Sequence, residues 1–373
     1  MASTTVALAG DTMLGRGVAE HLATHPARTL FGEELLEVLA ATDGMLLNLE
    51  CCLSERGEPW PGRVFHFRGP SSAVDALALL GVRGVTLANN HALDFGTQAL
   101  LDTLHTLSTA GIAVVGAGEN LATARAPVVI TFGRLAVTVV SFADHPAEYA
   151  ARPDRPGVAY ADLGDTVPDW LSARVRDASA SGTPVLVTPH WGPNLVQEPL
   201  PSVRRAAPAL TAAGATLVAG HSAHVFHGVA GRVLFDLGDF LDDYAVHPAL
   251  RNDLGLLWLV TFDDAGQPRS VEAVPLPPDL QPHDPGARRR RAMGPAAVPR
   301  SLQSLGDRRD RAGRPTPGAT EPEVRGRRGS HGDDRPVGSH CGLDPQAPTF
   351  DPRLPASVVW ATAPRSPCRA LVV

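Results

Sequence analysis

The stretch Thr5–Asp11, TVALAGD, joins a short apolar segment to a glycine and a carboxylate. An apolar segment of this length predicts a strand, which here ends at Gly10 and Asp11. Four further predicted strands, at 44–49, 84–88, 184–188 and 215–219, also lead into groups that can bind metals. These groups are Glu50, Asn90-His91, His190, and His221 with His224. Glycines before Asp11 and His221 allow close backbone approach where the strands end.

Amphipathic segments and hairpins lie between these strands. The spacing of apolar residues predicts helices over 73–80, 97–110 and 203–213, and a hairpin over 127–132 and 135–142. Segments 229–237, 256–261 and 270–275 are expected to add antiparallel strands. This alternation predicts one α/β layered domain over residues 1–280. Ligands of open α/β sheets bind at the carboxyl ends of strands, so we expect the polar groups to meet at one edge.

The composition is typical of a globular protein. The chain has 373 residues and a mass of 39.2 kDa, with 44% hydrophobic and 19% charged residues and a formal charge of −6. These values exclude a wholly disordered chain and a general basic field for nucleic acid. No apolar run approaches the ~18 residues of a membrane span, and the first residues lack a basic region followed by a long apolar core, so we expect no signal peptide. Four cysteines, two of them adjacent, make a disulfide framework impractical, so we expect a cytoplasmic protein.

The composition changes near residue 280. Segment 281–373 is rich in arginine, proline and glycine, carries 16 Arg against 9 acidic residues, and lacks periodic apolar residues. We predict that it is disordered, because it cannot bury enough apolar surface to offset its ordering entropy. The run 287–292, ARRRRA, could bind nucleic acid or an anionic surface, but no aromatic residues alternate with the arginines, and we expect no nucleic-acid partner. Out-of-frame translation of a GC-rich gene is a further hypothesis for this segment.

The polar residues at the strand ends form a mixed oxygen and nitrogen set. Two carboxylates, an asparagine and three imidazoles are too many for one tetrahedral ion, and they favour two divalent ions such as Mn²⁺, Fe or Zn²⁺. Two cations about 3.5–4 Å apart need a bridging carboxylate, which Glu50 or Asp11 could supply. Other polar residues could contact an anionic substrate or simply be solvated. They are Arg68, Asp239, Asp243 and Arg251.

Six sequence blocks occur in the order seen in a known family. They are GDTMLGR (10–16), NLE (48–50), ANNHALDFG (88–96), PHWG (189–192), GHSAHVFHG (220–228) and FDLGDFLDDY (235–244). In these blocks the chain resembles the poly-gamma-glutamate capsule-biosynthesis CapA family, within the calcineurin-like metallophosphoesterase superfamily. The resemblance covers about residues 4–275. It implies a four-layer α/β/β/α sandwich.

The resemblance also implies roles for individual residues. Asp11 resembles the first metal ligand, Glu50 the bridging acid and Asn90 the amide ligand of the second ion. His190, His221 and His224 resemble the remaining ligands. His91 resembles the acid that protonates the leaving group, acting alone or oriented by Asp94. Two departures from the superfamily pattern, Met13 in place of a histidine and Glu50 in place of an aspartate, predict that one metal site is weaker.

Three functions follow as hypotheses. The first is a phosphatase-like hydrolase that uses two divalent ions and a metal-activated water on an anionic small molecule or polymer, linked to poly-gamma-glutamate or capsule metabolism. The second is a non-catalytic, metal-binding accessory protein of polymer synthesis. The third is a hydrolase of gamma-glutamyl amide bonds. Members of the family are often membrane-anchored, whereas this chain begins at its first strand, which favours the soluble enzyme.

Overall fold

Two mixed β-sheets hold the strands that lead into the candidate site, in a computed structural model that describes residues 3–276 and 370–372. The first sheet has the order β18-β17-β16-β1-β2-β5-β6, and β15 also pairs with β1. Its strands are β1 (Thr4–Thr12), β2 (Met45–Leu49), β5 (Val82–Thr86), β6 (Ala113–Val115), β15 (Asp239–Leu241), β16 (Leu256–Phe262), β17 (Pro268–Pro275) and β18 (Ala370–Val372). β1, β2, β5 and β6 are parallel, so their carboxyl ends share one edge.

The second sheet has the order β13-β14-β12-β11-β9-β8. Its strands are β8 (Val128–Phe132), β9 (Leu135–Ala143), β11 (Val185–His190), β12 (Leu217–Ala219), β13 (Val229–Ala230) and β14 (Val233–Leu234). β9, β11, β12 and β14 are parallel to one another, and β8 forms a hairpin with β9. Two small strand pairs complete the described sheets. They are β3 (Cys52–Leu53) with β4 (Arg68–Gly69) and β7 (Ala117–Gly118) with β10 (Gly157–Val158).

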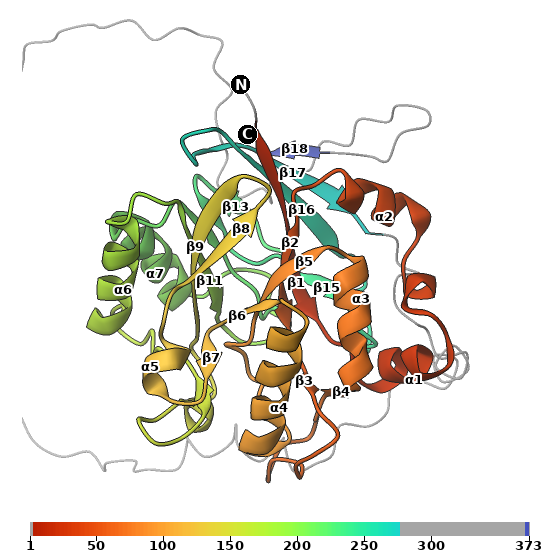
Figure 1. The fold of residues 1–373 in the computed structure, drawn as a ribbon. Coiled ribbons are helices and arrows are strands. Elements are labelled where there is room, and N and C mark those ends of the chain that lie inside the picture. The colour runs from red at the N-terminus through yellow and green to blue at the C-terminus, as the bar shows by residue number, and fades with distance from the viewer. Residues whose placement is uncertain (1–2, 277–369, 373) are drawn as a thin grey trace, which may run out of the picture. The chain divides into compact units, whose positions relative to one another are not determined.

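Helices flank the two sheets. They are α1 (Arg16–Thr24), α2 (Glu33–Ala40), α3 (Val74–Leu79), α4 (Gly96–Thr109), α5 (Leu121–Ala124), α6 (Asp169–Ser179) and α7 (Pro201–Ala212), with short 3-10 turns at Ala27–Leu30, Ser71–Ala73 and Ala147–Tyr149. Figure 1 shows α6 and α7 on one side of the molecule and α1 to α4 on the other, with the sheets between them. The chain is therefore a mixed α/β protein.

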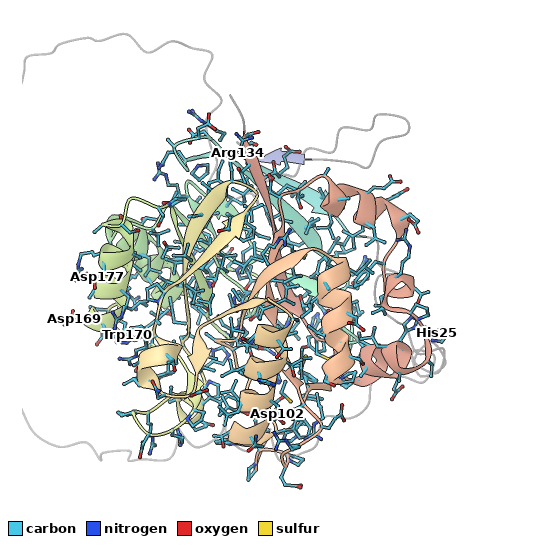
Figure 2. The ribbon with its side chains drawn as sticks, viewed as in Figure 1. His25, Asp102, Arg134, Asp169, Trp170 and Asp177 are labelled. Carbon is cyan, nitrogen blue, oxygen red and sulfur yellow. The ribbon has the colours of Figure 1, made fainter. Side chains whose placement is uncertain are left out.

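Buried apolar side chains form three clusters that follow the alternation of each strand. Val6 and Leu8 of β1 belong to a cluster that also holds Ile130 and Val139 of the second sheet. Their neighbours in β1 face the other way, into a cluster with residues of α1 to α4. The alternate residues of β9 and β11 join a third cluster with α6 and α7. Side chains of a strand point to opposite faces in turn, so each sheet buries both of its faces. Figure 2 labels Arg134 at the turn of the β8–β9 hairpin.

Most predicted strands agree with the structure to within a few residues. β1 extends to Thr12, beyond the predicted end, so Asp11 lies inside the strand. The predicted hairpin is β8 and β9, and the predicted helix 97–110 is α4. The antiparallel pairing predicted for 229–237 is present, but as two short strands instead of one continuous segment. There the chain turns at Gly231, which has φ +57°, and forms the β13–β14 hairpin.

The segment predicted to be disordered, 281–373, lies outside the described residues apart from 370–372. Those three residues form β18, which pairs antiparallel with β17 of the first sheet. For these residues the structure differs from the sequence prediction. An exposed edge strand offers unpaired backbone groups, which explains how even a short segment of low periodicity can pair there.

Candidate metal centre

Five residues predicted to bind metals come together from both sheets. Asp11 lies near the end of β1, and Glu50 follows β2. His190 ends β11, while His221 and His224 lie in the loop after β12. All five side chains are buried. The carboxylates thus come from the first sheet and the imidazoles from the second, as expected for strand ends that meet at one site.

Glycines make this meeting possible. A Cβ atom added at Gly10 would overlap the carbonyl oxygen of Gly238, and one added at Gly220 would overlap the indole of Trp191 and the carbonyl oxygen of Phe235. The backbone before Asp11 and before His221 therefore passes too close to its neighbours for any side chain. This confirms the close approach predicted from the sequence.

The five residues form two groups in which the ligand atoms lie within 4.8 Å of one another. One group contains Asp11, His190 and His221, and the other contains Asp11, Glu50 and His224. Asp11 is common to both groups, so it is the carboxylate placed between them. Glu50, which the family resemblance indicates as the bridging acid, belongs to one group and lies close to the other, because its Oε1 is 3.5 Å from His190 Nε2.

Asp11 is held by neighbours on both of its oxygens. Asn48 Nδ2 donates to Oδ1 at 2.7 Å, and the backbone N–H of Ser222 donates to Oδ2 at 3.1 Å. His221 Nδ1 and His224 Nδ1 lie 3.5 and 3.2 Å from these oxygens. Burial opposes ionisation of Asp11, but the hydrogen bond and positive charge of His224 outweigh it and lower the Asp11 pKa below 3.8.

Glu50 and His190 each present an atom without a partner. Glu50 Oε1 and His190 Nε2 are buried, make no hydrogen bond and lie 3.5 Å apart. Burial, followed by the charge of Asp11, raises the pKa of Glu50 well above 4.5. Burial, followed by neighbouring imidazoles, lowers the pKa of His190 well below 6.5. Buried polar atoms in proteins are nearly always paired, and a cation bound between these two atoms would satisfy both. The donor set therefore fits divalent metal ions.

Asp239 contacts a histidine instead of lining the rim of the site, where the sequence predicts it. Its Oδ1 lies 2.8 Å from His224 Nδ1, and its Oδ2 is buried without a hydrogen bond. Burial disfavours protonation of His224, but the charge of Asp239 and the hydrogen bond to Asp11 raise its pKa well above 6.5. A carboxylate on the ring nitrogen of a metal-binding histidine commonly fixes its orientation. Asp239 is placed for that role.

His91 and Asp94 form a hydrogen-bonded pair, as predicted. His91 Nδ1 lies 2.6 Å from Asp94 Oδ2, which also accepts the N–H of Phe67 at 2.8 Å. Tyr149 donates its hydroxyl to Asp94 Oδ1 at 3.1 Å, and Arg63 Nε lies 3.6 Å from the same oxygen. These contacts fix Asp94, and through it the His91 ring, whose Nε2 is left for a proton exchange.

Of the remaining predicted site residues, Asn90 has an unpaired side-chain atom, and the other three contact residues outside the two groups. Asn90 lies beside His91, and its Oδ1 is buried without a hydrogen bond. Arg68 donates to the backbone oxygens of Arg56 and Gly57, and its guanidinium covers the ring of Phe95 at 3.6 Å. Asp243 and Arg251 each form an ion pair, the first with a residue of α1 and the second with a residue two positions further along the chain. Asp243 Oδ1 lies 3.4 Å from Arg16 Nε, and Arg251 Nε lies 2.8 Å from Asp253 Oδ1.

The sequence analysis missed several residues that shape the site. Asn48 lies within the NLE block but was given no role. Tyr244, which ends the FDLGDFLDDY block, donates its hydroxyl to Glu50 Oε2 at 3.2 Å. His145 has its ring centroid 5.2 Å from that of His190. Asn48 and Tyr244 belong to the blocks that carry the family resemblance, which is the signal that could have identified them, whereas His145 has no such signal.

Fold and site together define an α/β protein with two groups of buried carboxylates and imidazoles that could hold metal ions. The family model described as "Bacterial capsule synthesis protein PGA_cap" matches residues 5–244. The chain belongs to this family. A probable polyglutamine synthesis accessory protein of Mycobacterium tuberculosis is 34% identical over 326 residues, which cover 73% of this chain and 84% of that protein.

Two Bacillus proteins are more distant relatives. The PGA biosynthesis protein CapA of Bacillus subtilis is 27% identical over 63% of this chain and 62% of its own length. The capsule biosynthesis protein CapA of Bacillus anthracis is 26% identical over 64% of this chain and 60% of its own length. The chain thus spans less than two thirds of either Bacillus protein. Among residues 3–276 and 370–372, no helix has the length and apolarity needed to cross a membrane.

Proposed function

We propose that this protein is a metal-dependent hydrolase of the calcineurin-like class, which cleaves a phosphoester or related bond of an anionic substrate in poly-gamma-glutamate or capsule metabolism. The observation that carries the proposal is the pair of three-residue groups sharing Asp11. Two divalent ions, Mn²⁺, Fe or Zn²⁺, suit this mixture of carboxylates and imidazoles. The three apolar clusters on either side of and between the sheets support a four-layer α/β/β/α arrangement for residues 1–280.

Each group of residues has a part in the proposed reaction. Asp11, Glu50 and the three imidazoles would hold the cations, with Asn90 as an additional amide ligand. When bound, a pair of divalent cations polarises an ester and makes a nearby water more acidic. His91, oriented through its Nδ1 by Asp94, would deliver a proton from Nε2 to the leaving group. The rim residues Arg68, Asp243 and Arg251, together with Asp239, would contact the substrate only if their present partners are exchanged.

A non-catalytic accessory role is the second candidate, in which the metal is structural or binds polymer carboxylates. The observation that favours it is the closure of the site, since Glu50 and His190 are both 0% exposed. Structural metal sites are closed, whereas catalytic sites keep an open position. The Mycobacterium tuberculosis relative is a probable accessory protein of polyglutamine synthesis, which agrees with this alternative. Cleavage of gamma-glutamyl amide bonds is a third candidate for the same residues. We expect the protein in the cytoplasm.

Elemental analysis combined with an aryl-phosphate assay tests the proposal. We expect purified wild-type protein to hold divalent metal and to turn over the substrate with Mn²⁺, Fe or Zn²⁺, and we expect the His190→Ala variant to lose turnover and mainly the ion of the group that contains His190. His105→Ala is the matched control, because His105 is an exposed residue of α4. Bound metal without turnover for any of the three ions would favour the accessory role instead. Absence of bound metal would contradict both.

A further inference from the structure

Tyr244 lies against one of the two groups of candidate metal ligands, the one formed by Asp11, Glu50 and His224. Its hydroxyl donates to Glu50 Oε2 at 3.2 Å. Its ring packs edge-on against His224, with centroids 5.0 Å apart, and tilted against Phe67 at 5.3 Å. Phe67 in turn packs against His91 at 4.2 Å. Tyr244 therefore contacts the candidate metal ligands through its hydroxyl and ring, and the proposed proton donor through Phe67.

The hydroxyl of Tyr244 makes the two oxygens of Glu50 different. Oε2 has a hydrogen-bond donor, whereas Oε1 has none and faces His190 Nε2 at 3.5 Å. The terminal torsion of a glutamate is broad, so a carboxylate without a fixed partner can turn either oxygen towards a ligand. A phenol bound to one oxygen removes this freedom. Oε1 is thereby held towards Nε2 of His190, which belongs to the other group.

We propose that Tyr244 is a positioning residue that holds Glu50 so that its Oε1 can serve the ion of the His190 group as well as that of its own group. The proposal rests on the proposed function, because it requires that the two groups bind cations. In this proposal Glu50 serves both ions, although it belongs to only one of the two groups. The proposal also gives the loop that follows β15, which contains Tyr244, a part in metal binding that is separate from any contact with the substrate.

The variant Tyr244→Phe isolates the hydroxyl. Phenylalanine keeps the ring that packs against His224 and Phe67, so the loop retains its apolar contacts. Tyr149→Phe is the matched control, because Tyr149 is also a buried tyrosine whose hydroxyl donates to a carboxylate, Asp94, outside both groups. The two variants therefore lose the same atom and the same kind of hydrogen bond. They differ in whether that bond reaches a candidate metal ligand.

Calorimetric titration of metal-free protein with Mn²⁺ alone provides the test. We expect the wild type to bind two ions, and we expect Tyr149→Phe to bind both ions with the affinities of the wild type. In Tyr244→Phe we expect one ion to bind as in wild type and the other about 10- to 100-fold more weakly, the usual loss when a second partner of a metal ligand is removed. Thermal unfolding of the three metal-free proteins, with Tyr244→Phe close to wild type, excludes a general loss of structure.

The outcomes separate this inference from the proposed function. Binding of two ions by Tyr244→Phe with wild-type affinities would overturn the role of Tyr244 and leave the proposed function in place. An equal loss in Tyr149→Phe would also overturn it, since the effect would not depend on Glu50. Failure of the wild type to bind Mn²⁺ or, in a parallel titration, Zn²⁺ would overturn the proposed function and the inference together.

Discussion

The Nδ1 atoms of His190 and His221 lie 2.9 Å apart, although the two residues are 31 positions apart in the chain. An isolated parallel bridge between the same residues extends the β11–β12 pairing beyond the end of β12. The backbone therefore fixes both imidazoles before any ligand arrives. Two neutral nitrogens this close share one proton, and a proton on His190 Nδ1 leaves the lone pair on His190 Nε2, the atom that faces Glu50 Oε1.

The two groups predict separate effects of their histidines. His221 and His224 belong to different groups, so we expect His221→Ala to deplete mainly one ion and His224→Ala mainly the other. Removal of one ligand from a site weakens that site first, because the remaining ligands of the other site are intact. Metal analysis after dialysis against a weak chelator measures this. Equal loss of both ions in each variant would count against two sites.

Asp239 provides a second test, through His224. We expect Asp239→Asn to weaken one ion about 10- to 100-fold, because the amide supplies no charge to His224 Nδ1 and holds the ring less firmly. Titration with Mn²⁺ measures the affinity, and Asp263→Asn, at a surface ion pair with Arg269, is the control. If Asp239 binds substrate as the sequence predicts, the variant will instead keep its metal and show a raised KM.

Asp94→Asn tests the orientation of His91. The amide carries no negative charge, so it no longer stabilises the doubly protonated His91 ring from which Nε2 would release a proton. We expect kcat for an aryl phosphate to fall about 100-fold, within the usual range for general acid–base catalysis. Bound metal should stay at the wild-type level, because Asp94 is in neither group. Wild-type turnover in this variant would show that the pair has a structural role only.

Gly220→Ala tests the close approach before His221. The added methyl group would meet the indole of Trp191 and the carbonyl oxygen of Phe235, so the strand end must shift. We expect a loss of stability of about 1–3 kcal/mol, typical of overpacking, together with weaker metal binding. Gly228→Ala is the matched control, because a Cβ there has no atom within 4 Å. Thermal unfolding and metal titration of both variants check the prediction, and equal behaviour of the two would contradict it.

The sequence predicted which polar strand ends come together better than it predicted several of the helices, and the reason is physical. Short apolar strands end at or near Asp11, Glu50 and His190, and this change from apolar to polar residues can be read from the sequence. A parallel sheet then brings such strand ends together at one edge. The helices α1, α2 and α6 were not predicted, because each is short, with eight to eleven residues, and a short helix depends mainly on its tertiary packing.

Side-chain partners were the part that the sequence could not supply. Spacing shows that Asp239 and Tyr244 lie in an acidic block, but not that one meets His224 and the other Glu50. Arg68 was equally ambiguous. Its contacts with Phe95 and two backbone oxygens depend on how a long loop folds back, and no periodic pattern encodes that path.

The Arg56–Asp102 pair gives a prediction for pH. Arg56 donates to both oxygens of Asp102, which lies on α4 (Figure 2), and Ser54 donates at 2.6 Å. The hydrogen bond from Arg56, against a smaller effect of burial, lowers the Asp102 pKa from 3.8 to about 2. A folded-state pKa below the unfolded value stabilises the protein above pH 3.8. That contribution is lost as the pH falls towards 2.

We therefore expect Asp102→Asn to lower the free energy of unfolding at pH 6 by about 1 kcal/mol or less, because the pair lies at the surface. The difference from wild type should shrink steadily when urea unfolding is repeated at lower pH, between 4 and 2. A difference that stays constant over that range would show that the carboxylate charge contributes nothing and that the variant acts through its shape.

Because its donors come from two separate sheets, the proposed metal pair would act as a cross-link as well as a reagent. Asp11 and Glu50 belong to one sheet and His190 and His221 to the other, with the cluster of Val6, Ile130 and their neighbours between the sheets. Sliding of one sheet over the other would pull the donors apart. Metal affinity in this protein should therefore depend on how well the facing apolar sides of the two sheets pack against each other, although those side chains bind no ion.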